Sequence, residues 1–97
     1  MTTLLLRFRV ADYDAWRPEY DSAIERTSEV RSSRVWRGQD DPNLVVIAET
    51  YDSREVAEAL LAEALADPAI QAEIEEYGVD MSSVQIDYLD EVGTGTG

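Results

Sequence analysis

Five consecutive apolar residues, Leu44 to Ala48, constrain the fold of this 97-residue chain more than any other feature. The run is short and follows a segment rich in turn formers at 38–43, so we predict a strand over 44–51. Successive side chains of a strand point to opposite faces of its sheet. A sheet with one face in water alternates apolar and polar residues, so this run predicts that both faces are covered.

Alternating apolar and polar residues predict three more strands. Residues 4–10 form the first strand, and residues 32–37 form the second, which pairs with 44–51 as a hairpin. The alternation of Val84, Ile86 and Tyr88 with polar neighbours predicts the last strand.

Apolar residues at helical spacing predict helices between these strands. Asp12 is the predicted N-cap of a helix that runs to about Arg26. Pro18 lies inside this helix, so we expect a loose first turn or a kink. Asp52 and Glu55 have the spacing of a capping box at the start of a second helix.

A short third helix is predicted to begin at Asp67-Pro68 and to end near Gly78. The resulting order predicts an α+β fold, a ferredoxin-like βαββαβ antiparallel sheet with its helices on one face and the first strand in the centre. We expect a single domain over 1–91 and a flexible Gly/Thr tail over 92–97.

Helices can cover only one face of such a sheet, so the other face needs a second cover. Leu5, Leu89 and Trp36 add to the apolar surface there, which is large for a monomer. We therefore predict a homodimer with sheet packed on sheet about a two-fold axis. The alternative is that charged residues keep this face in water; the candidates are Arg7, Arg9, Arg34 and Asp87, and one of the first two could pair with Asp87 across neighbouring strands.

Missing residue types exclude several chemistries. The chain has no Cys, no His and no Lys, since all eight basic residues are Arg. Disulfides, thiolate nucleophiles, Ser-His-Asp triads, Schiff-base lysines and His- or Cys-based metal or haem sites are thereby excluded from this chain. We expect neither a metal nor another cofactor.

The net charge is −13, and residues 49–97 hold a single Arg against thirteen acids. Such a field repels nucleic-acid phosphates and anionic lipid, so we predict neither nucleic acid nor membrane as a partner. The first residues lack the pattern of a signal peptide, and no apolar run is long enough to span a bilayer. A cytoplasmic location is the expectation.

Several segments resemble the dimeric α/β-barrel superfamily, which includes small antibiotic-biosynthesis-monooxygenase and polyketide-cyclase-like proteins. Residues 8–16 (FRVADYDAW) look like the first strand and helix entry of these proteins. Residues 41–46 resemble their hairpin and third strand, and 49–53 resemble the entry to their second helix. Residues 67–68 and 77–79 are similar to their second helical hairpin.

This resemblance implies a ferredoxin-like protomer, a barrel-shaped dimer and a small-molecule cavity between sheet and helices. Activities differ widely within the superfamily, and its haem-degrading branch needs a histidine that this chain lacks. Related monooxygenase-like proteins often carry a histidine on the second helix, after a Glu-x-aromatic strand end. Glu49 and Tyr51 match that strand end, whereas Leu60 lies near the place of the histidine.

Glu49 is the candidate for acid–base chemistry, because it follows an apolar run and burial makes a carboxylate a stronger base. A tyrosine, with Tyr51 as the candidate, or an arginine would stabilise the enolate that forms beside it. The alternative is a structural carboxylate at the strand end, paired with Arg34 or Arg37. Four further aromatic residues are candidates for binding a flat ligand, or are ordinary core residues: Phe8, Trp16, Tyr20 and Tyr88.

These residues leave more than one function open. The first hypothesis is a small homodimeric, cofactor-free enzyme or enzyme-like protein that acts on an aromatic or polyketide-type molecule, as a cyclase or in a monooxygenase-like way. The second is a dimeric small-molecule-binding or accessory module without catalysis, and the third is a structural interaction domain. The sequence does not decide whether the chain is an enzyme.

Overall fold

The computed structural model describes residues 1–93 and 95. Strands and helices follow one another in the predicted order. Their bounds are β1 Thr2–Arg9, α1 Tyr13–Glu25, β2 Ser32–Arg37, β3 Leu44–Tyr51, α2 Arg54–Ala66, α3 Pro68–Glu76 and β4 Asp80–Leu89. In the predicted tail, residues 94, 96 and 97 lie outside the described part of the chain, and Val92 is exposed.

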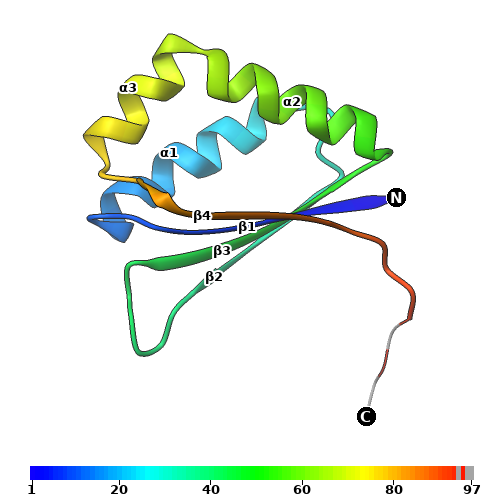
Figure 1. The fold of residues 1–97 in the computed structure, drawn as a ribbon, viewed down its shortest axis with the longest axis horizontal. Coiled ribbons are helices and arrows are strands. Elements are labelled where there is room, and N and C mark those ends of the chain that lie inside the picture. Colours follow the sequence, from blue (N-terminus) through cyan, green and yellow to red (C-terminus); the bar gives the residue numbers. More distant parts are fainter. Residues whose placement is uncertain (94, 96–97) are drawn as a thin grey trace.

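The four strands form one antiparallel sheet in the order β2-β3-β1-β4. Figure 1 shows all three helices on the same side of this sheet, with no helix on the opposite side. We call the side toward the helices the inner face and the opposite side the outer face. The predicted ferredoxin-like arrangement, with β1 in the centre, is confirmed.

Helix starts and ends follow local sequence signals. The Asp12 side chain accepts hydrogen bonds from the backbone N–H groups of Asp14 and Ala15, so the predicted N-cap of α1 is confirmed. For α2 the predicted cap is wrong by one residue. The N-cap is Ser53, which has an extended backbone directly before the first helical residue. Its side chain accepts a hydrogen bond from the backbone N–H of Val56.

Other local features depart from or extend the prediction. The helix α1 continues through Pro18 to Glu25. The predicted end of the third helix near Gly78 is confirmed: α3 ends at Glu76, and Gly78 has a φ of 65°, the left-handed conformation that favours glycine. The strand β4 begins at Asp80, before the predicted alternation, and its register shifts between Arg7 and Arg9 of β1.

The core lies between the inner face and the helices. Leu4, Val45 and Ile47 are almost fully buried there. The helices themselves bury few side chains: α1 buries Trp16, α2 buries Ala57 and α3 buries none. The sheet therefore supplies most of the packed core. Hollows remain between the sheet and the helices that lie over it.

The outer face carries the other half of the apolar run. Val46 and Ala48 point to it and are only partly covered, while Trp36 is 48% exposed. Asp87 lies opposite Leu5 on β1 rather than opposite an arginine, because the register of the two strands fixes that pair.

The predicted arginine partner for Asp87 is therefore wrong. Arg9 forms its ion pair with Asp41 of the hairpin loop, and among the described residues Arg7 forms none.

Candidate functional site

Three adjoining hollows lie between the inner face and the helices, and Tyr20 lines all of them. The first, of about 200 Å³, reaches from Tyr20 to Glu49 and Tyr51 below α2. The second, of about 260 Å³, has almost only apolar walls, including Phe8 and Trp16. The third, of about 160 Å³, lies between α1 and α3.

Glu49 is the central polar group of the first hollow. It is 7% exposed, and each of its carboxylate oxygens accepts a hydrogen bond from a phenol. The Tyr51 hydroxyl donates to Oε1 at 2.7 Å, and the Tyr20 hydroxyl donates to Oε2 at 2.7 Å. Ser33 Oγ lies 2.9 Å from the Tyr20 oxygen, to which it donates because the Tyr20 proton points to Glu49. The carboxylate is therefore buried and hydrogen-bonded, and it forms no ion pair with any residue that the structure describes.

The sheet register explains most of this arrangement. Glu49 and Tyr51 stand two residues apart on β3, so both point to the inner face. Ser33 of β2 lies directly opposite Glu49 in the ladder. Tyr20 reaches the same carboxylate from the inner side of α1.

The alternative considered for Glu49, an ion pair with Arg34 or Arg37, is not found among the described residues. Arg34 lies opposite Ala48, so it belongs to the outer face. Arg37 donates to the backbone oxygen of Pro42, and its guanidinium lies over the Tyr13 ring. Both arginines are thus held away from the carboxylate by strand register and by the hairpin.

Both phenols beside Glu49 stay protonated at neutral pH. Burial raises the pKa of Tyr20 above its usual range, and the negative charge of Glu49 raises it further. Burial also raises the pKa of Tyr51, and so does its hydrogen bond to Glu49. These hydroxyls are therefore available as hydrogen-bond donors, to Glu49 or to an oxygen that develops negative charge nearby.

Aromatic rings continue the wall away from the carboxylate. Trp16 stacks on Tyr20 with ring centroids 5.1 Å apart, and Phe8 meets Trp16 edge-on at 5.6 Å. Tyr88 lies elsewhere: it packs beside Leu4 and Tyr51, with Arg54 over its ring at 4.5 Å, and it lines none of the three hollows. Of the residues proposed from the sequence, the structure thus brings all but Tyr88 to the hollows.

Sequence reasoning missed two polar residues of this region. Ser33 could have been found from the hairpin, since the pairing of β2 with β3 places it opposite Glu49. Tyr77, which lines the third hollow, gave no signal except its aromatic ring near the end of α3.

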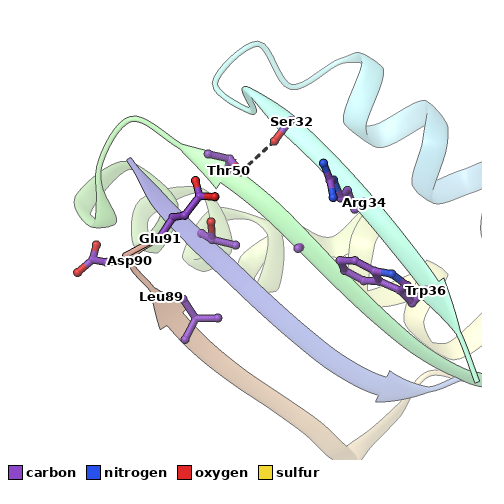
Figure 2. Close-up of a pocket in the computed structure, with 9 residues that line it drawn as sticks. Ser32, Arg34, Trp36, Thr50, Leu89, Asp90 and Glu91 are labelled. Carbon is purple, nitrogen blue, oxygen red and sulfur yellow. Dashed lines mark hydrogen bonds between the residues drawn. The ribbon is translucent and has the colours of Figure 1, made fainter. Parts of the chain in front are cut away.

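The outer face holds a different, more polar hollow of about 400 Å³. Figure 2 shows Arg34 and Trp36 on one strand, with Ser32 hydrogen-bonded to Thr50 and with Leu89 across the sheet. This hollow is open to the outside, and a second molecule packed on the outer face would close it.

In the described part of the chain, no group of three or more acidic side chains is placed to hold a metal ion. No helix there has the length and apolar character needed to cross a membrane.

The sequence matches no protein-family model and no curated protein. Solved structures are similar: a protein from Chloroflexus aurantiacus assigned to the antibiotic biosynthesis monooxygenases is 20% identical and has a TM-score of 0.66 over 98% of this chain and 96% of its own. Rv0793 from Mycobacterium tuberculosis is 19% identical, with a TM-score of 0.61 over 98% of each chain. The cofactor-independent oxygenase SnoaB from Streptomyces nogalater is 14% identical, with a TM-score of 0.58 over 98% of this chain and 94% of its own.

This chain shares its fold with the antibiotic biosynthesis monooxygenases. The resemblance drawn from the sequence is confirmed at that level, because the similarity extends over nearly the whole of each chain. A shared fold does not carry activity with it, so function has to be argued from the site.

Proposed function

We propose that this protein is a small, homodimeric, cofactor-free enzyme that binds an aromatic or polyketide-type molecule between its sheet and helices. The observation that carries this proposal is the buried Glu49 carboxylate, held by two phenols in a hollow that adjoins an apolar, aromatic one through Tyr20. Flat apolar walls suit a ring system, and a few polar groups at one end fix its orientation.

Glu49 acts as the general base in this proposal. Each of its oxygens has a second lone pair beside the one taken by a phenol, so it can accept a proton from an acidic phenol or from a carbon between two carbonyls. Tyr20 and Tyr51 then donate to the enolate oxygen that forms, since both hydroxyls keep their protons. Phe8 and Trp16 hold the ring.

Two reactions can follow this deprotonation without a cofactor. In a cyclase, the carbanion attacks a carbonyl carbon of the same molecule. The proton returns to the alkoxide that forms, and the resulting alcohol then loses water. In an oxygenase, the carbanion reacts with O₂, one oxygen atom becomes a ring carbonyl and the other leaves as water. The similarity to SnoaB, a cofactor-independent oxygenase, favours the second reaction as the first to be tested.

Turnover of polyphenols and anthrones by the purified protein tests the proposal. We expect Glu49→Gln to lower turnover about 100- to 10,000-fold, the usual contribution of a positioned base. Incubation with and without O₂ distinguishes oxygenase from cyclase. Turnover that survives unchanged in Glu49→Gln and Tyr51→Phe would exclude this mechanism.

The proposed homodimer rests on the outer face. Its central positions, Val46, Ala48 and Leu5, are apolar, and Arg34 and Asp87 stand at opposite ends of the row that contains Ala48 and Leu5. A two-fold axis along the strands would place Arg34 of one copy opposite Asp87 of the partner subunit. The charges at the two ends of this row are therefore complementary to each other across such an axis.

A non-catalytic binding module is the second candidate. Both oxygens of Glu49 already accept a phenol proton, and such a satisfied carboxylate is also what a purely structural role requires. Under this alternative, ligands bind the hollows, and no tested substrate is turned over.

A further inference from the structure

The third hollow, between α1 and α3, combines aromatic walls with negative charge. Trp16, Tyr20 and Tyr77 line it, together with Glu19 of α1 and Glu73 of α3. Among residues 1–93 and 95, no arginine lines this hollow or the two that adjoin it. The ionised side chains around the whole internal space are thus carboxylates.

Glu19 and Glu73 come from two different helices and are both partly buried. Within the described part of the chain, neither takes part in an ion pair. Burial raises the pKa of Tyr77, which lines the same hollow, and the negative charges of Glu19, Glu76 and Glu73 raise it further. Glu19 and Glu73 thus bring two carboxylates to one hollow, and an ammonium ion bound there would supply the opposite charge.

Aromatic faces and carboxylates are the two groups that recognise organic ammonium ions. We propose that the hollow between α1 and α3 binds the ammonium group of an arylalkylamine, in which at least one carbon separates the amine from the aromatic ring. The ring of the ligand extends past Trp16 into the apolar hollow, because Trp16, Tyr20 and Ile74 line both spaces. This names the class of ligand for the site proposed above and rests on that proposal for the place of the ring.

Three probes of similar size and different charge test the inference: naphthylmethylamine, naphthalenemethanol and naphthoate. Binding is followed by fluorescence in a Trp36→Phe protein, in which Trp16 is the single remaining tryptophan. We expect the amine to bind about tenfold more tightly than the alcohol, which corresponds to about 1.4 kcal/mol, and the naphthoate to bind most weakly.

A double variant, Glu19→Gln with Glu73→Gln, should remove the preference for the amine and leave binding of the alcohol unchanged. Glu25→Gln with Glu75→Gln is the matched control, since it makes the same change of net charge at exposed positions of the same two helices outside the hollow. This control should keep the preference.

Four results would overturn the inference. They are equal binding of amine and naphthoate, a preference that persists in the Glu19/Glu73 variant, a preference lost equally in the control, and no binding of any probe. The turnover test of Glu49→Gln is separate. An amine preference without turnover would support the cation site and reject the proposed catalysis. Turnover without an amine preference would support the proposed catalysis and reject the cation site.

Discussion

At the scale of single residues, the unusual feature is a buried carboxylate that pairs with no cationic side chain in the described part of the chain. Glu49 is held by two phenols, whereas each of the ion pairs found in the described residues lies at the surface. Because exposed ion pairs add little to stability, the phenol contacts matter more for the fold than the arginines do.

Tyr20→Phe removes one of the two donors to Glu49. We expect the free energy of unfolding to fall by about 1–3 kcal/mol, since a buried carboxylate oxygen then loses its partner. Urea unfolding measures this change. Tyr13→Phe is the control, because the Tyr13 hydroxyl contacts the partly exposed Arg17 instead. Equal losses in both variants would contradict a special role for the Glu49 contact.

Alkaline pH provides a second test of the same phenols. The pKa values of Tyr20 and Tyr51 are raised in the folded protein from a reference value of 10.0, so the folded state keeps protons that the unfolded state loses. Their contribution to stability is complete below about pH 10 and is lost as pH rises from there toward the folded pKa values. Thermal unfolding against pH should show this decline, and it should be smaller in a Tyr20→Phe/Tyr51→Phe protein. An unchanged decline would assign it to other groups.

At the scale of elements, helix ends fix how α2 and α3 are placed over the sheet. Ser53 caps α2, Asp67 caps α3, and Gly78 turns the chain from α3 into β4. A Cβ atom at Gly78 would lie 2.5 Å from the Cβ of Ala11, so both conformation and space require glycine there.

Gly78→Ala should therefore lower the free energy of unfolding by about 1–2 kcal/mol or more, from the left-handed backbone alone. For a domain of this size each kcal/mol corresponds to a melting temperature about 4–8 °C lower. Gly93→Ala is the matched control, because nothing lies within 4 Å of a Cβ atom at that position. Similar melting of the two variants would count against the close approach to Ala11.

The cap of α2 gives a further prediction at this scale. Ser53→Ala should cost about 1 kcal/mol, because the N–H of Val56 loses its acceptor. Asp52→Ala removes an exposed ion pair with Arg31 and should cost less than about 1 kcal/mol. Chemical unfolding of both variants compares them, and a larger loss at Asp52 would reverse the assignment of the cap.

At the scale of the whole molecule, the helices cover one face of the sheet and leave the other open. Helices lie over the inner face, and the described chain leaves the outer face open (Figure 1). Apolar side chains on an open face are the physical reason to expect a second copy.

Val46→Asp should therefore convert a micromolar dimer to monomer, since it places a charge at the centre of the proposed interface. Ala59→Asp adds the same charge at an exposed position of α2 and should leave the dimer intact. Sedimentation velocity measures both, with circular dichroism to show that each variant is folded. A wild-type protein that is monomeric at that concentration would show that the outer face tolerates water.

The sequence by itself determined the strands, the helices and their order, because these depend on periods, caps and turns a few residues long. The run from Leu44 to Ala48 also required a sheet with two apolar faces, as found on β3. The pairing of Glu49 with Tyr51 as neighbours on one face followed from their spacing alone.

Only the tertiary structure decided which groups meet Glu49. Tyr20 is 29 positions away in the chain, and its contact depends on how α1 is rotated and placed over the sheet. Arg34, one of the two arginines considered as partners, does not meet Glu49, because the strand register places it on the outer face. The placement of Glu19 and Glu73 at one hollow is of the same kind, since the position of α1 beside α3 is set by packing rather than by local sequence.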